Sequence, residues 1–491
     1  MDVSNFFFER GVFLAKDALD YILSQDEPDA YARAVLEKNK GKKFLTLSDV
    51  VIKQEKVETK EKEINLPSDF KPIAKDIEPR IKIFEEFDVT GKSESSGSVN
   101  DFIDFFRDRF NRISEILRSR PGPTVKDIKR LKKIRPTETA RIIGMVSDKR
   151  MSRTGHYLIH IEDLSDNLTV LVPKDNQSLM AKASSILPDE VIAVDGRFSR
   201  GDLFIASDII QPDIPKKEPK TSDEDIALAM ISDLHVGSNL FLEKYFRKFL
   251  DWLNGKGERK DLAERIKYIT IAGDLVDGIG VYPGQEDELE ILDIYEQYKY
   301  FEGLIAEIPE YIEIIVIPGN HDAVRVAAPQ PALPKELAPD LHSMENVHLL
   351  GSPSYVSLHG IEVLLYHGQS IHSFVPHISG FDYSKPEQLG VEVLKRRNLH
   401  VVYGEKPPIT PEKRDYFVIE RVPDIMHFGD VHKNGYTTYR GVTIVNSGTW
   451  QDITPYQIKQ GHHPTPCILP VMTLRDRRTS LLKFRRGGYG T

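Results

Sequence analysis

The sequence predicts an α/β protein, in which a C-terminal region with a sheet core follows a small β-barrel and a short helical module. The first observation is that compact apolar runs alternate with helical patterns from Asp225 onward, as expected where helices cover a sheet. The second is that five short strand-like segments fall within residues 137–212, a density typical of small barrels. The third is the length of 491 residues, which exceeds one ordinary hydrophobic core and favours several domains.

Residues 1–53 are predicted to form the helical module. Apolar residues recur there at helical spacing, as in Ala18, Ile22 and Leu23. We expect this apolar face to contact a partner, with a poorly packed extension as the alternative. A charged run that is poor in aromatic residues follows over residues 54–100. Because that composition buries little apolar surface, the run is predicted to be a linker.

Residues 101–136 are predicted to form a helical connector, because apolar residues recur at three- and four-residue steps. This stripe consists of Phe102, Phe106, Phe110, Ile113 and Leu117. A basic cluster near the end of the connector is predicted to contact DNA phosphates, with a solvated helix face as the equal alternative. The candidate residues are Lys129, Arg130, Lys132 and Lys133.

Residues 137–215 are predicted to form a barrel of the oligonucleotide-binding (OB) type. The five expected strands are 140–146, 157–161, 168–172, 191–198 and 203–209. Barrels of this type track single strands with basic grooves and stacking aromatic residues. Such aromatic residues are sparse in this segment, so a purely structural barrel is an equal alternative.

Residues 221–491 are predicted to form the sheet-containing domain, and five apolar runs there each end in a polar motif. The runs are 226–231, 268–271, 314–317, 363–365 and 425–428. The motifs that follow them are, in order, Asp233-Leu-His235, Gly273-Asp274, Gly319-Asn320-His321-Asp322, His367-Gly368 and Gly429-Asp430-Val431-His432. Because ligands at the carboxyl ends of strands meet in one crevice, these side chains are expected to converge.

The residue types in these motifs suit divalent cations. Carboxylate, amide oxygen and imidazole donors bind Mn²⁺, Mg²⁺ or Zn²⁺, and two such ions can hold the attacking and leaving oxygens of a phosphoryl displacement. Each motif alone is more often a cap, a turn or a structural histidine. The five motifs in order predict a metal-dependent phosphoesterase core.

The ordered motifs resemble those of the calcineurin-like metallophosphoesterase superfamily, whose fold is a β-sandwich flanked by helices. The resemblance covers about residues 225–450. Three further features are narrower: the preceding barrel, the tract Ala327-Ala328-Pro329-Gln330-Pro331 and the tract Gly448-Thr449-Trp450-Gln451. With these, nearly the whole chain resembles the small subunits of archaeal family D DNA polymerases.

This resemblance implies a 3′→5′ proofreading exonuclease that uses two divalent metal ions, in a heterodimer with a large catalytic polymerase subunit. The substrate would be single-stranded or primer–template DNA. By the same resemblance, the first metal is held by Asp233, His235 and His432, and the second by Asn320, His367 and Asp430. Asp274 would bridge the two metals.

The resemblance also implies that His321 faces the scissile phosphate and that Asp322 orients it. Arg325 is a further candidate for a phosphate contact, with a surface salt bridge as the alternative. Asp277 is expected to support the site or to cap a helix. Four other histidines have no motif partner and are expected to be structural or exposed. They are His372, His427, His462 and His463.

One position departs from the superfamily pattern, since Asp430 stands where Gly-His-x-His usually has its first histidine. The added carboxylate favours Mg²⁺ or Mn²⁺ over softer ions. Two other functions share the motifs. One is an inactive scaffold of the polymerase, as resemblance to eukaryotic small subunits suggests, and the other is a phosphatase or cyclic-nucleotide phosphodiesterase.

The bulk composition sets outer limits. The net charge of −9 argues against a chain that grips nucleic acid over its whole surface. No stretch approaches the about 20 apolar residues that a membrane helix needs. The single cysteine, Cys467, fits a reducing compartment. We therefore expect a cytoplasmic protein without a membrane partner.

Overall fold

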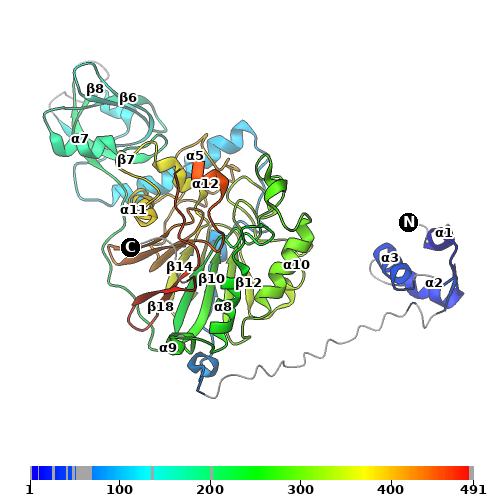
Figure 1. Cartoon of the computed structure of the whole chain (residues 1–491). Helices are drawn as coiled ribbons and strands as arrows, with labels where there is room; N and C mark the ends of the chain where they lie inside the picture. Colours follow the sequence, from blue (N-terminus) through cyan, green and yellow to red (C-terminus); the bar gives the residue numbers. More distant parts are fainter. Residues whose placement is uncertain are drawn as a thin grey trace. The chain divides into compact units, whose positions relative to one another are not determined.

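The computed structural model describes residues 3–8, 10–24, 28–39, 42–46, 50, 69–133, 138–199, 203–459 and 461–485. The chain divides into two compact units, Met1–Asn65 and Leu66–Thr491, and Figure 1 shows both. Among the described residues, no helix is long and apolar enough to cross a membrane.

The N-terminal unit is helical, as predicted. It contains α1 (Val3–Phe8), α2 (Lys16–Leu23) and α3 (Pro28–Lys38), with a short parallel pair of strands, β1 (Phe13–Leu14) and β2 (Phe44–Leu45). Ala18 and Ile22, four residues apart on α2, are fully buried, because residues at that spacing share one helix face. Phe8, Phe13 and Phe44 remain more than half exposed.

The prediction of a linker over residues 54–100 is wrong from residue 69 onward. Residues 69–98 contribute η1 (Ile73–Asp76), β3 (Ile81–Ile83) and η2 (Glu85–Phe87) to the large unit. β3 pairs antiparallel with β13 (Ser354–Leu358), and Phe84 and Phe87 are buried. Strand pairing and these buried aromatic residues therefore anchor the segment to the large unit. Residues 54–68 of the predicted linker lie outside the described residues.

The helical connector begins with α5 (Val99–Arg118), whose start is fixed by a capping box between Ser98 and Asp101. Its predicted stripe is partly confirmed, because Phe110, Ile113 and Leu117 are buried at three- and four-residue steps. A short helix, α6 (Ile128–Leu131), follows, and residues 134–137 are not described.

The predicted five-stranded barrel is confirmed. Its strands close in the order β4-β5-β6-β8-β7. They are β4 (Thr139–Met151), β5 (Tyr157–Glu162), β6 (Asn167–Val172), β7 (Val191–Phe198) and β8 (Leu203–Ile210). Helix α7 (Gln177–Ser184) connects β6 to β7. Alternate residues such as Ile159, Ile161, Val170 and Val172 are buried, as the two-residue period of a strand requires.

The large unit also holds two six-stranded sheets. The first has the order β12-β11-β10-β9-β18-β19, with strands Val347–Leu349, Glu313–Ile317, Ile266–Ala272, Ala227–Ile231, Ile468–Thr473 and Thr479–Lys483. The second has the order β16-β17-β15-β14-β13-β3, with strands Asn434–Tyr439, Val442–Ser447, Ile425–Phe428, Ile361–Leu365, Ser354–Leu358 and Ile81–Ile83.

The two sheets form a sandwich flanked by helices. One apolar core joins residues of both sheets, such as Leu228 and Tyr268 of the first and Val363 and Val445 of the second. Helices α8 (Glu243–Leu253) and α10 (Ile294–Ile305) cover the outer face of the first sheet, and α11 (Pro386–Arg396) covers that of the second (Figure 1). The predicted α/β sandwich is therefore confirmed at this level.

Parallel strands in both sheets place the motifs. In the first sheet β9, β10 and β11 run parallel, and in the second β14, β15 and β17 run parallel. Five of these, β9, β10, β11, β14 and β15, match the five predicted apolar runs. Their carboxyl ends carry the polar motifs, which are thus brought to one edge of the sandwich.

Candidate metal centre

The predicted ligands follow the carboxyl ends of strands in both sheets. Asp233 and His235 follow β9, Asp274 follows β10 and Asn320 follows β11 in the first sheet. In the second sheet, His367 follows β14, while Asp430 and His432 follow β15. The structure brings all of them together in two adjoining clusters.

Most of these residues adopt an unusual backbone conformation. The φ angles of Asp233, His235, Asp274, Asp430 and His432 lie between 51° and 64°, in the left-handed region that non-glycine residues rarely occupy. Each such residue costs of order 1 kcal/mol or more and persists only where its surroundings enforce it. Their concentration at one edge of the sandwich indicates a functional site.

Two glycines of the motifs leave room for the carboxylates. A Cβ atom at Gly319 would lie 2.2 Å from Oδ1 of Asp274, and one at Gly429 would lie 2.4 Å from Oδ2 of Asp233. No side chain fits at such distances, so the motifs require glycine at both positions.

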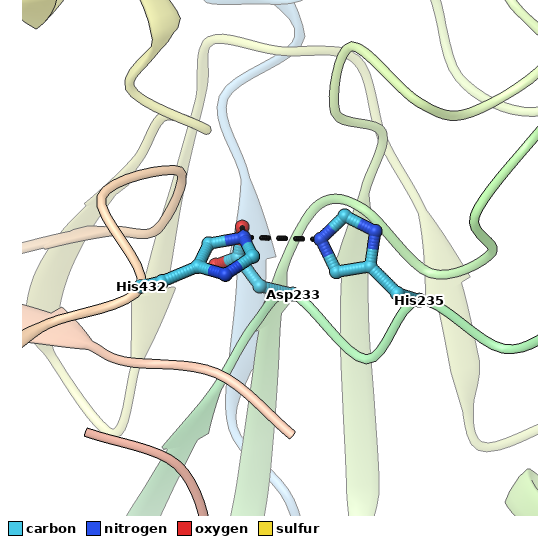
Figure 2. A group of neighbouring side chains, drawn as sticks. All are labelled: Asp233, His235 and His432. Carbon is cyan, nitrogen blue, oxygen red and sulfur yellow. Dashed lines mark hydrogen bonds and ion pairs between the residues drawn. The ribbon is translucent and has the colours of Figure 1, made fainter. Parts of the chain in front are cut away.

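The first cluster consists of Asp233, His235 and His432 (Figure 2). The Nε2 atoms of His235 and His432 are 3.1 Å apart, and Nε2 of His432 lies 3.4 Å from Oδ1 of Asp233. Behind His235, Oδ1 of Asp277 is 3.0 Å from its Nδ1 and accepts the Nδ1 hydrogen. This fixes the tautomer in which the Nε2 lone pair faces the cluster.

The second cluster gathers around His367. Its Nε2 lies 3.0 Å from Oδ1 of Asn320, 3.3 Å from Oδ1 of Asp274 and 3.6 Å from Oδ1 of Asp430. Its Nδ1 donates to the carbonyl oxygen of Ala272 at 2.8 Å. Because Nδ1 carries the hydrogen of this bond, Nε2 of His367 is left to bind a metal ion on the side that faces the three oxygens.

Asp274 lies between the clusters. Its Oδ1 is 3.3 Å from Nε2 of His367, and its Oδ2 is 3.7 Å from Nε2 of His235. Oδ1 also accepts the backbone N–H of His321 at 2.9 Å, which fixes the rotation of the carboxylate. A single carboxylate therefore presents one oxygen to each cluster.

The electrostatics reflect the density of buried carboxylates. Burial by itself lowers the pKa of His367, but Asp274, Asp233 and Asp430 together raise it well above the usual value. Burial by itself raises the pKa of Asp274, yet His367, His321 and His235 hold it far below its usual range. Burial and the charge of Asp274 raise the pKa of Asp322 to about 7. Such a concentration of negative charge attracts cations.

The donor set fits divalent cations. Three groups of described residues each place one ligand atom per residue within 4.8 Å of the others: Asp233–His235–His432, His235–Asp274–His321 and Asp233–Asp274–His367. Carboxylate, amide and imidazole donors of this kind suit Mn²⁺, Mg²⁺ or Zn²⁺. The residues present are therefore able to hold metal ions.

The predicted pairing of Asp322 with His321 is wrong. Nδ1 of His321 lies 2.7 Å from the backbone carbonyl oxygen of Asp277, which orients the ring instead. Asp322 accepts from the backbone N–H of Gly319 at 2.7 Å and from the hydroxyl of Tyr298 at 3.1 Å. It fastens the turn that carries Asn320 and His321, so its support for His321 is indirect.

His372 is a residue of this site that sequence reasoning missed. Its Nε2 lies 2.5 Å from Oδ2 of Asp430. The only signal in the sequence is its position five residues after His367, and a single histidine at that spacing carries little information. The predicted structural role of His427 is confirmed, because its ring nitrogens contact the hydroxyls of Thr270 and Ser447. His462 contacts the carbonyl oxygen of Val431 at 2.6 Å.

Arg325 is the first of the residues predicted to contact DNA. The guanidinium of Arg325 bonds the carbonyl oxygen of Pro329 and the side chains of Ser93 and Glu412. The predicted alternative, a salt bridge, is present with Glu412 at 3.0 Å, and a phosphate contact by Arg325 stays a prediction.

In the basic cluster, Lys132 pairs with Asp166 at 2.9 Å. Arg130 is 82% exposed and lies 3.5 Å from Asp127, a weak surface pair. The phosphate contacts predicted for Lys129, Arg130 and Lys133 remain predictions.

The structure thus defines a helix-flanked β-sandwich with a candidate metal centre, joined to a closed barrel. A DNA polymerase II small subunit from Methanothermobacter thermautotrophicus is 36% identical over 475 residues, which cover 95% of this chain and 96% of that protein. The DNA polymerase II small subunit of Methanocaldococcus jannaschii is 44% identical over 85% of this chain and 70% of that protein.

Residues 228–437 match the model of the family described as the B-subunits of DNA polymerases alpha and epsilon. Among solved structures, a novel archaeal phosphodiesterase aligns with 13% identity over 52% of this chain and 99% of that chain, with a TM-score of 0.27. A score this low does not establish a shared fold. The chain belongs to the family of archaeal DNA polymerase II small subunits, and the resemblance seen in its sequence is confirmed.

Proposed function

We propose that this chain is the 3′→5′ exonuclease subunit of a replicative DNA polymerase and hydrolyses terminal phosphodiesters with two divalent metal ions. The position of Asp274 carries the proposal, because its two oxygens face the clusters around His235 and His367. A carboxylate in this position can serve two metal ions at the separation that phosphoryl displacement needs. The calcineurin-like pattern of motifs and the family of the chain support the same conclusion.

The ligands divide between the two ions as the clusters do. Asp233, His235 and His432 would hold the first ion, and Asn320, His367 and Asp430 would hold the second. Asp274, whose two oxygens face the two clusters, would serve both. Mn²⁺ and Mg²⁺ are favoured because oxygen donors dominate the second cluster. When bound, the two ions stabilise the charge that develops on the phosphoryl oxygens.

His321 is the general acid of the proposed reaction. Its Nδ1 hydrogen is held by the carbonyl oxygen of Asp277, which leaves Nε2 for the substrate. Burial lowers the pKa of His321, but Asp274 and Asp277 raise it above the usual value overall. A ring that keeps its proton near neutral pH can deliver it to the leaving 3′ oxygen.

Other parts of the chain are proposed to bind DNA and a partner subunit. We assign the closed barrel to the OB type, because its five strands enclose an apolar core and a helix connects β6 to β7. Lys129, Arg130 and Lys133 lie ahead of it and are proposed to contact the phosphates of single-stranded or primer–template DNA. A large catalytic subunit forms the heterodimer, and the complex acts in the cytoplasm.

The test is degradation of single-stranded DNA by the purified chain with Mn²⁺, using 3′-labelled and 5′-labelled strands in parallel. The proposal expects release of labelled mononucleotide from the 3′ end at once, and progressive shortening of the 5′-labelled strand. Loss of Mn²⁺ to a chelator should stop both. Hydrolysis of small phosphate esters only would favour a phosphatase or cyclic-nucleotide phosphodiesterase. No hydrolysis, even with the polymerising subunit added, would favour a scaffold.

A further inference from the structure

The carboxylate of Asp430 is buried, and its two oxygens have different surroundings. Its side chain is 8% exposed. Oδ1 faces the second cluster, 3.6 Å from Nε2 of His367. Oδ2 forms an ion pair with His372, whose Nε2 lies 2.5 Å away, and it accepts no hydrogen bond of ordinary geometry from the described residues. A buried carboxylate oxygen that lacks a hydrogen bond is costly unless an opposite charge compensates it, so the ion pair with His372 is the contact that holds Oδ2.

His372 is itself held in place from two sides. It lies on η5 (Gln369–Phe374), a 3₁₀ helix that begins directly after the ligand motif His367-Gly368. Ile371 and Phe374, on either side of it, are fully buried, so the turn is anchored in the core. The ring of Tyr383 packs against the ring of His372, with centroids 5.1 Å apart.

The sequence explains why such a partner is needed. Asp430 stands where the superfamily usually has a histidine, which has a single nitrogen to offer a metal and is already rigid. An aspartate brings two equivalent oxygens and a shorter side chain, so it can rotate away or bind through both oxygens. An ion pair on Oδ2 restricts that freedom and leaves Oδ1 to face the metal site.

We propose that His372 is a positioning residue that fixes Asp430 as a ligand through Oδ1, and that the Asp430–His372 pair replaces the usual histidine. The inference rests on the proposed function only in requiring that the site binds two metal ions. Partners behind a metal ligand typically change metal affinity by about 10–100-fold when they are removed.

The experiment is Mn²⁺ binding by the full chain without DNA, measured by calorimetry and by electron paramagnetic resonance. Wild-type protein should bind two ions. His372→Ala should lower the affinity for the second ion by about 10–100-fold. The affinity for the first ion, at Asp233, His235 and His432, should stay within twofold of the wild-type value. His372→Gln, which keeps an N–H donor, should recover part of the loss.

Two further variants sharpen the result. Asp430→His combined with His372→Ala restores the superfamily pattern and should bind the second ion more tightly than His372→Ala alone. His377→Ala is the matched control, because His377 is also partly exposed and paired with a carboxylate, Glu405, at 2.8 Å. It should bind both ions like the wild type. Circular dichroism confirms that each variant is folded.

Wild-type affinity for both ions in His372→Ala, or no recovery in the double variant, would overturn the inference. These outcomes differ from failure of the proposed function. Suppose that the wild-type protein binds two Mn²⁺ ions with the expected dependence on His372 but degrades no DNA. That result would overturn the proposed exonuclease activity and support the proposed role of the Asp430–His372 pair. Wild-type protein that binds fewer than two ions would overturn both.

Discussion

Two buried histidines at neighbouring strands of the second sheet have pKa values shifted in opposite directions. His367 follows the end of β14, and His427 lies within the adjacent parallel strand β15, where it pairs with Leu365. Both side chains are almost fully buried. Burial lowers the pKa of His427 to about 3, whereas nearby carboxylates raise the pKa of His367 well above its usual value.

The neighbours explain the difference. His427 contacts the hydroxyls of Thr270 and Ser447, which offer hydrogen bonds and no net charge. His367 faces Asp274, Asn320 and Asp430. A histidine within the sandwich is therefore structural, and one placed just past the strand end joins the carboxylate cluster. Burial alone does not identify a ligand, and the position relative to the strand end does.

The largest expected effect follows from removing the carboxylate between the clusters. Asp274→Ala should reduce Mn²⁺-dependent hydrolysis of DNA by at least about 10³-fold, because both metals lose a ligand that contributes several kcal/mol. It should also lower the pKa of His367 toward that of His427. Turnover of 3′-labelled DNA and Mn²⁺ stoichiometry measure the effect. Asp251→Ala, which removes a surface carboxylate paired with Lys256, is the control and should retain full activity.

His321→Ala should slow the chemical step while the metals stay bound. The expected loss in kcat is about 10²–10⁴-fold, the usual contribution of a general acid. Single-turnover kinetics and a parallel Mn²⁺ titration separate the two effects. Unchanged kcat, or loss of a metal ion with the activity, would contradict the role assigned to His321. His348→Ala removes a histidine that is paired with Glu313 and should have no effect on the rate.

His427 should make the protein sensitive to acid. Its pKa in the folded state, about 3, lies below the usual value of 6.5, so the unfolded chain binds the proton more readily. Stability is therefore lost as the pH falls from about 6.5 toward 3, by about 1.4 kcal/mol per pH unit.

His427→Gln has no titrating ring and should lose about 1.4 kcal/mol less than the wild type between pH 7.5 and 5.5. Urea unfolding at the two pH values measures the difference. Equal pH dependence in the two proteins would show that His427 is charged in the fold as readily as outside it.

The smallest expected effect concerns the basic cluster near the barrel. Lys129→Ala combined with Arg130→Ala should reduce the slope of log affinity for single-stranded DNA against log salt by about 1.4, or about 0.7 for each phosphate contact. Fluorescence anisotropy with a catalytically inert ion, Ca²⁺, measures it. Lys182→Ala removes a lysine that is already paired with Asp208 and should leave the slope unchanged.

The sequence was most informative where a local pattern has a fixed geometry. The strands of the barrel have a two-residue period, and Asp233, Asp274, His367 and Asp430 each follow a short apolar run. Both patterns lie within one segment of chain. All predicted ligands consequently fall in the two clusters that the structure shows.

The features that were missed depend on pairs distant in the chain. The contact of His372 with Asp430 joins residues 58 positions apart, and β3 pairs with β13 across more than 270 residues. Neither has a local signature. The role that the resemblance implies for Asp322 also depends on where its side chain turns, and the carboxylate turns toward Gly319 and Tyr298 rather than toward the ring of His321.

Anomalous diffraction at the manganese edge, from crystals of the full chain grown with saturating Mn²⁺, locates bound metal ions directly. We expect two peaks about 3.5–4 Å apart, one on each side of the Asp274 carboxylate. The first peak should lie against Asp233, His235 and His432, and the second against Asn320 and His367. A single peak, or two peaks that do not share Asp274, would show that this site does not hold two metal ions on one carboxylate.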